Sequence, residues 1–240
     1  LDSSNFPAAA KAVPRVGDHQ RLDIERIVAL KPDVVLAWHH GNSERELEQI
    51  EAAGLRVVRL EPNRLADVPR AIERIGVLTG HDAQAMKSAQ ALRSELAALR
   101  LRYGSAAPVS VFFQVWTRPL MTLGGPQLIS DVIGLCGGHN VFADLEPLAP
   151  QVSTEAVVAA APQALLTTRQ GHGDPADLAF TRSPADPVYA MWSPFTSIPA
   201  VRHGWMFLLP GDVLVRQGPR IAQGARAVCE ALDVVRRERR

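Results

Sequence analysis

The sequence predicts an α/β protein built from two similar lobes, and three observations support this class. Residues 25–38 (ERIVALKPDVVLAW) and 155–168 (EAVVAAAPQALLTT) share one pattern, in which apolar residues at helical spacing lead to a proline and then to an apolar strand. Helical and strand patterns alternate along the chain, as parallel sheets require. Residues 81–103 form an uninterrupted run of helix formers. We therefore expect two lobes with parallel sheets and a ligand cleft between them.

The first half is expected to begin irregularly, because Pro7, Pro14 and Gly17 interrupt residues 1–20. The elements expected next are a helix ending at Leu30, a strand over 34–38, a helix over 44–53, a strand over 55–60 and a helix over 67–78. Asp23 and Ser43 are placed to cap the first two of these helices.

The run over residues 81–103 contains neither Gly nor Pro and predicts a helix of about 22 residues, roughly 33 Å long. Such a helix is too long for an ordinary crossover, so we interpret it as a rigid strut joining the lobes. The expected division is an N-terminal lobe over 1–80, an inter-lobe helix over 81–104 and a C-terminal lobe over 105–240.

The second half is expected to repeat the alternation. The predicted elements are a strand over 109–116, a helix over 128–134, a helix capped by Ser153, a strand over 164–168, an irregular segment over 170–187, a strand over 205–209 and a helix over 220–235. Gly124 and Gly125 indicate a turn, and Gly137 and Gly138 indicate a helix stop.

Composition excludes several classes of protein. A net charge of +1 over 240 residues gives no electrostatic reason to expect nucleic acid as a partner. The basic run at 236–240 is interpreted as a solvated helix end. No apolar run approaches the roughly 20 residues that span a bilayer.

The sequence carries no local catalytic motif: GxGxxG after a strand, GxxxxGK[ST], HExxH, GxSxG and paired CxxC are all missing. His39 and His40 adjoin the end of a predicted strand, where neighbouring side chains point to opposite sides and cannot bind one ion together. We expect them to form a polar rim of the cleft, with no catalytic residues, no metal site and no catalytic cofactor.

The rare aromatic residues fall where ligands bind in α/β proteins. Trp38 and Trp116 end predicted strands, while Phe6 and Trp192 lie in irregular segments. Ligands collect beyond the carboxyl ends of parallel strands, so these rings are typical of a site for a flat, largely apolar ligand. The alternative is that Trp116 and Trp192 are core residues.

The two cysteines, Cys136 and Cys229, lie far apart in the sequence in apolar helical contexts. Either two buried inert thiols or one structural disulfide fits this pattern.

Six segments taken together resemble the periplasmic cobalamin-binding proteins of vitamin B12 importers. The segments are AWHHGN (37–42), LEPNRLADV (60–68), FFQVW (112–116), LCGGHNVF (135–142), QVSTEAVVAAAPQALL (151–166) and LPGDVLVRQGPRI (209–221). These proteins belong to the helical-hinge (class III) substrate-binding proteins, which also serve haem and iron–siderophore importers. The resemblance runs from about Ser3 to the last helix. It implies two Rossmann-like lobes joined by one long helix.

The resemblance also implies a function and a set of site residues. The protein would be a monomer in the periplasm, soluble or lipid-anchored, that captures a corrinoid and delivers it to the membrane permease of an ABC transporter. The implied ligand-binding residues are Phe6, Trp38, His39, His40, Asn42, Trp116, Trp192, Asp212 and Arg216. Glu155 would dock on the permease, with Asp67 beside the other family position, which is Ala66 here. Cys136 and Cys229 fall where the family pairs its cysteines.

Members of the family usually open with a strand and a helix before the segment corresponding to Ser3, and this chain is expected to lack both.

Three kinds of alternative function stay open. Haem binding would rest on His39 or His40, iron–siderophore binding would need cleft arginines such as Arg59, Arg118 and Arg216, and a chelatase-like enzyme or a cofactor-scaffold or adaptor protein would share the twin-lobed plan.

Overall fold

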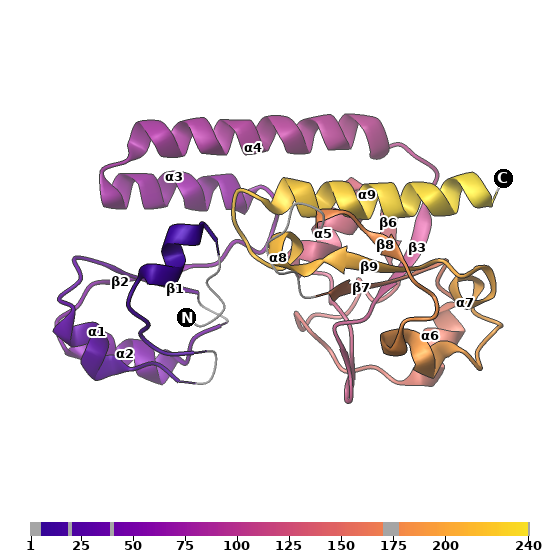
Figure 1. Cartoon of the computed structure of the whole chain (residues 1–240), viewed down its shortest axis with the longest axis horizontal. Helices are drawn as coiled ribbons and strands as arrows, with labels where there is room; N and C mark the ends of the chain where they lie inside the picture. Colours follow the sequence, from indigo (N-terminus) through magenta and orange to yellow (C-terminus); the bar gives the residue numbers. More distant parts are fainter. Residues whose placement is uncertain (1–5, 19–20, 39–40, 170–177, 240) are drawn as a thin grey trace. The chain divides into compact units, whose positions relative to one another are not determined.

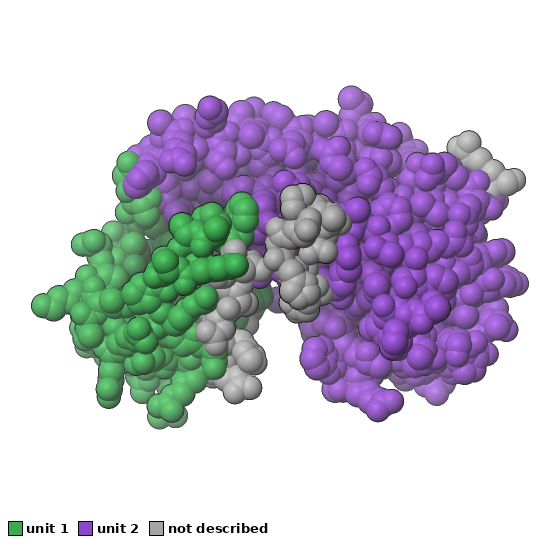
Figure 2. Space-filling view, viewed as in Figure 1, with its two compact units in different colours: residues 1–61, 77–80 green, residues 62–76, 81–240 purple. Residues whose placement is uncertain are grey.

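The structure is a computed structural model that describes residues 6–18, 21–38, 41–169 and 178–239 (Figure 1). The chain divides into two compact units, which Figure 2 distinguishes by colour. The smaller unit comprises residues 1–61 and 77–80, and the larger unit comprises residues 62–76 and 81–240. Each unit contains a sheet with parallel strands and helices, so the predicted α/β class is confirmed.

The smaller unit has a two-stranded parallel sheet. Its elements are η1 (Ala8–Ala12), α1 (Ile24–Ala29), β1 (Val35–Trp38), α2 (Glu44–Ala52) and β2 (Val57–Leu60). All but the short 3-10 helix η1 were predicted. Its core consists of Ile27, Ala37, Leu47 and Ile50, because α1 and α2 pack their apolar sides against one face of the two strands.

Arg59 of β2 is held against α2. Its guanidinium pairs with the carboxylates of Glu44 at 2.6 Å and Glu51 at 2.7 Å, both on that helix. These contacts raise the arginine pKa and lower the pKa of Glu51, in each case mainly through the hydrogen bonds. Ser43 occupies the N-cap of α2, but within the described residues its hydroxyl makes no capping hydrogen bond.

The larger unit has a five-stranded sheet in the order β6-β3-β7-β9-β8. The strands are β3 (Val109–Phe113), β6 (Gly138–Asn140), β7 (Ala164–Arg169), β8 (Thr181–Arg182) and β9 (Met206–Pro210). All neighbours are parallel except β8, which pairs antiparallel with β9. A separate hairpin joins β4 (Trp116–Thr117) to β5 (Leu120–Met121). The predicted strand over 109–116 therefore ends at Phe113, and the chain then turns into the hairpin.

The helices of this unit are α3 (Asp67–Thr79), α4 (Asp82–Tyr103), α5 (Leu128–Leu135), α6 (Thr154–Ala160), η3 (Pro187–Trp192), α7 (Pro199–His203), α8 (Gly211–Leu214) and α9 (Ile221–Glu238). Helices α5, α7, α8 and α9 contact the strands of the five-stranded sheet, and the last residues of α3 belong to the smaller unit. Helix α9 packs against β3 and β9, and α4 packs against α9 (Figure 1).

The long helix α4 begins at Asp82, one residue after the predicted start, and ends at Tyr103 as predicted. Its residues Leu92, Leu96 and Leu99 are buried in the main core of the larger unit. Residues 62–76 also belong to the larger unit, whereas the sequence pattern assigns them to the N-terminal lobe. The lobe boundaries and the strut between the lobes stay predictions.

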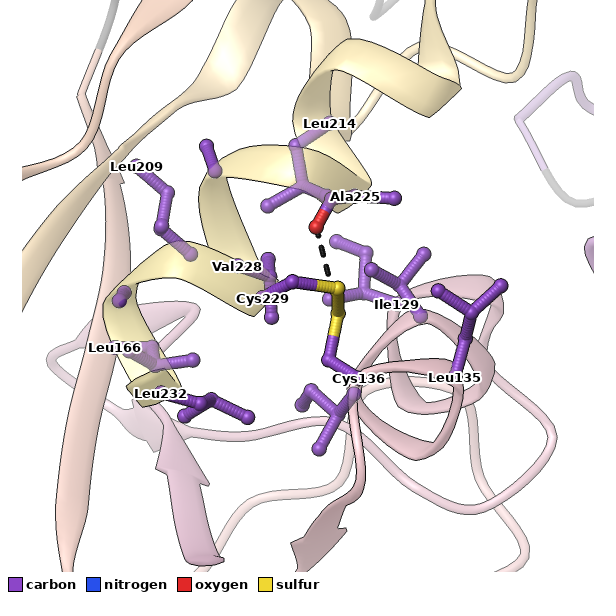
Figure 3. Close-up of a cluster of buried hydrophobic side chains, with 14 of the residues drawn as sticks. Ile129, Leu135, Cys136, Leu166, Leu209, Leu214, Ala225, Val228, Cys229 and Leu232 are labelled. Atoms are coloured by element: carbon purple, nitrogen blue, oxygen red, sulfur yellow. Dashed lines mark hydrogen bonds between the residues drawn. A yellow bond between two sulfur atoms is a disulfide. The ribbon is translucent and has the colours of Figure 1, made fainter. Parts of the chain in front are cut away.

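A disulfide lies in the core of the larger unit. Cys136 follows α5 directly and Cys229 lies within α9, and their sulfur atoms are bonded. Figure 3 shows the bond among apolar side chains from both helices and from the sheet, including Ile129, Leu166 and Leu232. The predicted pairing is confirmed.

The sequence repeat corresponds to one local structure formed twice. Asp23 caps α1 by accepting the backbone N–H of Arg26 at 3.0 Å, and Ser153 caps α6 by accepting that of Ala156 at 3.1 Å. Seven residues into each repeat, Lys31 and Ala161 have left-handed backbones with φ of 46° and 44°. A proline and a parallel strand follow each time, β1 in the smaller unit and β7 in the larger one.

Candidate functional site

The predicted ligand-binding residues are divided between the two units. Phe6, Trp38 and Asn42 belong to the smaller unit, while Trp116, Trp192, Asp212 and Arg216 belong to the larger one. His39 and His40 lie outside the described residues.

In the smaller unit, Trp38 is the last residue of β1 and its side chain is exposed (46%). The backbone N–H of Trp38 donates to the side-chain oxygen of Asn42 at 2.9 Å. The indole packs so closely on Gly41 that a Cβ there would lie 2.1 Å from the ring. Asn42 and Gly41 thus form a tight turn that holds Trp38 at the end of the strand. Phe6, in the opening segment, is also exposed (58%).

In the larger unit, Trp116 opens the β4–β5 hairpin and is 62% exposed. Its indole N–H donates to the carbonyl of Arg118 at 3.0 Å. The polar atom of the ring is therefore satisfied within the hairpin, while most of the ring is left for contact with another molecule.

The burial of Trp192 contradicts the prediction that its side chain lines the ligand site. This side chain is fully buried in the second core cluster of the larger unit, where it packs edge-to-face on Phe112 with ring centroids 5.6 Å apart. Its indole N–H donates to Gln114 at 2.7 Å. A ring with no exposed surface cannot stack on a ligand, so the alternative of a core residue is correct for Trp192 and wrong for Trp116.

Asp212 and Arg216 form an ion pair at 3.1 Å, one helical turn apart at α8. Asp212 is mostly buried, and the Arg216 side chain is about one-third exposed. Arg220 lies near both, since burial first and then the charge of Arg216 lower its pKa, while Asp212 raises it. This corner of the larger unit can offer both donors and acceptors to polar groups of a ligand.

The two predicted docking carboxylates have different surroundings. Glu155 is exposed in the first turn of α6, and its pKa is lowered by hydrogen bonds from its own backbone N–H and from Ser153. Asp67, at the start of α3, accepts the backbone N–H of Arg64 at 3.0 Å and pairs with Arg70 at 3.2 Å. Glu155 is the more available of the two.

An open depression of about 810 Å³ lies in the smaller unit and contains none of the predicted site residues. Carboxylates on its wall accept backbone N–H groups of the same unit, as Glu46 does from Leu22 at 3.0 Å. We assign it no ligand. Within the part of the chain that the structure describes, no group of three or more His, Cys, Asp or Glu side chains could hold a metal ion, and no helix has the length and apolar character to cross a membrane.

One residue of the site region was not singled out from the sequence. Gln114 is a polar residue inside the apolar run VFFQVW, and its amide is buried beneath the Trp116 hairpin. Its polarity within a buried strand was the available signal, because buried amides need hydrogen-bond partners.

The chain belongs to a family of periplasmic binding proteins: the model of the periplasmic binding protein family matches residues 2–213. The family is one of substrate-binding proteins, as the sequence resemblance indicated.

Within the family of periplasmic binding proteins, the chain is similar to proteins named for vitamin B12. The Vitamin B12-binding protein of Vibrio parahaemolyticus serotype O3:K6 (strain RIMD 2210633) is 32% identical over 238 residues, which is 99% of this chain and 82% of that protein. The Vitamin B12-binding protein of Yersinia pestis (strain Pestoides F) is 34% identical over 229 residues, 95% of this chain and 76% of that protein. The crystal structure of the periplasmic vitamin B12 binding protein BtuF of Vibrio cholerae superposes with a TM-score of 0.85 at 31% identity, covering 98% of this chain and 87% of that one.

Proposed function

We propose that this protein is a periplasmic carrier that captures a corrinoid and delivers it to the membrane permease of an ABC importer. The observation that carries the proposal is the exposure of Trp38 and Trp116, two large rings that folded proteins usually cover. Relatives named as vitamin B12-binding proteins over nearly the whole chain support the same ligand class.

The exposed rings account for affinity and the polar corner for orientation. Phe6, Trp38 and Trp116 would contact the apolar faces and edges of the corrin through dispersion and stacking. The Asp212–Arg216 pair would exchange hydrogen bonds with the amide side chains of the corrinoid, since an arginine offers donors and a carboxylate offers acceptors. Asn42, whose side-chain oxygen accepts the backbone N–H of Trp38, would line the site beside that ring. The role is binding without chemistry, and the corrinoid is cargo.

Delivery would use exposed charge on the larger unit. Glu155 would meet a basic side chain of the permease, with Asp67 as a weaker second contact because Arg64 and Arg70 already engage it. Contacts of this kind are weakened by salt, which suits a carrier that must dissociate after delivery. The carrier would act as a monomer in the periplasm, either soluble or held by a lipid anchor.

Haem and iron–siderophore binding are less well supported. Tyr103 and Tyr189 are both buried and neither offers an accessible iron ligand, so haem binding would rest on His39 or His40, which lie outside the described residues. Arg59, which a siderophore site would need, is engaged by Glu44 and Glu51.

Titration of the protein with cyanocobalamin, cobinamide and haemin, followed by tryptophan fluorescence and calorimetry, tests the proposal. We expect tight binding of the corrinoids and weak binding of haemin. Trp116→Ala should weaken corrinoid binding about tenfold or more, because truncating an aromatic contact residue typically costs more than 1 kcal/mol. Leu101→Ala is the matched control, since Leu101 is an exposed apolar residue (87%) outside the proposed site.

Haemin binding in preference to both corrinoids would contradict the proposal. So would a Trp116→Ala variant that binds cyanocobalamin as tightly as the wild type does.

A further inference from the structure

Gln114 lies where the chain leaves the sheet of the larger unit and enters the β4–β5 hairpin. Its backbone N–H donates to Leu166 of β7 at 2.8 Å, and its carbonyl accepts the hydroxyl of Thr167 at 2.7 Å. The next residue, Val115, already donates to Met121 of the hairpin at 2.9 Å. Gln114 is therefore the last residue tied to the sheet, and its side chain is 1% exposed.

The amide of Gln114 is hydrogen-bonded at both ends. Its oxygen accepts the indole N–H of Trp192 at 2.7 Å. Its nitrogen donates to the carbonyl of Val188 at 3.0 Å and to the hydroxyl of Thr117 at 3.3 Å. An indole N–H can only donate, so the amide oxygen must face Trp192 and the amide nitrogen must face Thr117. Trp192 thus selects the amide orientation in which Gln114 holds the hairpin.

Contacts with the rest of the unit hold the hairpin in place. On its second strand, the carbonyl of Leu120 accepts the backbone N–H of Val152 at 3.0 Å. On its first strand, beside Trp116, Thr117 bonds to the Gln114 amide. The hairpin consists of two residue pairs, Trp116 with Met121 and Thr117 with Leu120. An isolated two-stranded hairpin is marginally stable at best in water, so its direction depends on contacts with the rest of the unit. Thr117 is the direct neighbour of Trp116, and its bond to Gln114 reaches the hairpin next to the exposed indole.

We propose that Gln114 and Trp192 are positioning residues, whose buried hydrogen bonds hold the β4–β5 hairpin so that the exposed ring of Trp116 is set for the corrinoid. The inference rests on the proposed function. Neither residue touches the ligand, since both are buried. Fully satisfied buried polar networks favour a single arrangement, and the loss of one member leaves its partners unpaired.

The first test is a double-mutant cycle on ligand binding. Gln114→Leu removes the amide while keeping an apolar side chain of similar size. We expect the Kd for cyanocobalamin to rise about tenfold, as it would if the competent hairpin orientation fell to roughly a tenth of the population. In a Trp116→Ala background, the same substitution should change the Kd by less than about twofold, because the ring that the network positions has been removed.

Two further variants keep the test decisive. Thr117→Val removes the acceptor on the hairpin and should reproduce the effect of Gln114→Leu, even if the latter does not fold. Tyr189→Phe is the matched control, since Tyr189 is equally buried and donates to Phe207 at 2.6 Å without contacting Gln114 through a hydrogen bond. It should lower stability and leave the Kd unchanged.

A readout without ligand separates this inference from the proposed function. With fluorine-labelled tryptophan, the NMR resonance of Trp116 can be assigned as the one lost in Trp116→Phe. Gln114→Leu and Thr117→Val should broaden or split this resonance and leave that of Trp38 unchanged, and Tyr189→Phe should alter neither.

The outcomes are distinct. A wild-type protein that binds no corrinoid contradicts the proposed function, while the NMR result still tests the anchoring of the hairpin. An unchanged Trp116 resonance in both network variants overturns the inference, as does an equal loss of affinity in the presence and absence of Trp116.

Discussion

Glu238, in the last turn of α9, connects three parts of the larger unit through one carboxylate. It accepts the indole N–H of Trp205 at 2.8 Å and pairs with Arg182 of β8 at 2.7 Å. Arg182 in turn donates to the carbonyls of Gly204 and His203. The short antiparallel strand β8 is thus fastened to the end of α9 and to the turn before β9.

These contacts lower the pKa of Glu238, first through the hydrogen bond from Trp205 and then through the charge of Arg182. A carboxylate with a lowered folded-state pKa stabilises the protein above its unfolded pKa, which is the ordinary glutamate value of about 4.5, and this stabilisation is lost as the pH falls through the folded pKa. We predict that wild-type protein is more stable than Glu238→Gln near neutral pH and that the difference shrinks as the pH falls below about 5.

The urea midpoint measured across this pH range checks the prediction, with Glu230→Gln, exposed on the same helix, as the control. The effect should be small because the Glu238 side chain is partly exposed and its ion pair is screened. A stability difference that stays constant with pH would show that the charge of Glu238 is not what stabilises this end of α9.

At the scale of elements, both copies of the helix–proline–strand unit contain a residue whose left-handed backbone conformation is unfavourable in free energy. Ala161 ends α6 in the left-handed region, with φ of 44° and ψ of 55°, as Lys31 does after α1. For a residue with a Cβ this conformation costs about 1–2 kcal/mol, which glycine avoids. In both copies a proline follows directly and disfavours the right-handed helical conformation at Lys31 and Ala161, so the helix ends there.

We predict that Ala161→Gly raises the free energy of unfolding by roughly 0.5–1 kcal/mol, after allowance for the greater freedom of glycine in the unfolded chain. Ala161 is exposed, so little side-chain packing is lost. Ala159→Gly, at an exposed position inside α6, is the matched control and should lower stability by up to about 1 kcal/mol. Denaturant unfolding of the three proteins compares them, and destabilisation by both glycines would refute the argument.

The helices and strands that could be predicted are those whose own residues carry a local sequence signal, such as a cap, a proline or an unbroken run of helix formers. The caps Asp23 and Ser153, the prolines after α1 and α6 and the unbroken run of α4 all act locally, so the sequence displays them. Strands β6 and β8 were missed because three or two residues form a strand only when a partner offers its edge, as β3 and β9 do here.

The candidate site residues likewise divide into those marked by local sequence and those that depend on contacts between distant segments. Trp38 and Trp116 could be placed after apolar runs from the sequence alone, and both are exposed, while their contact with a ligand stays a prediction. Trp192 and Gln114 could not be assigned from the sequence, since the burial of one and the role of the other depend on a hydrogen bond between residues 78 positions apart.

At the scale of the whole molecule, the two units differ greatly in the means that stabilise them. The larger unit has a five-stranded sheet, two extensive core clusters and a disulfide between residues 93 positions apart. A crosslink over such a separation restricts the unfolded chain and typically contributes about 2–4 kcal/mol. Among its described residues, the smaller unit has two strands and a core cluster of four buried apolar side chains.

We therefore predict that backbone amides of β1 and β2 exchange with solvent faster than those of β3 and β7 in the free protein. Local opening requires less free energy where few apolar contacts must be broken. Cyanocobalamin should slow exchange in β1, because a ligand that contacts Trp38 binds only the folded smaller unit and stabilises it by mass action. Hydrogen exchange followed by mass spectrometry measures both effects, and Trp38→Ala should abolish the protection of β1 by ligand while leaving β7 unchanged. Equal exchange in the two units would mean that the small core is stabilised by contacts other than its own, and ligand protection confined to the larger unit would remove Trp38 from the binding surface.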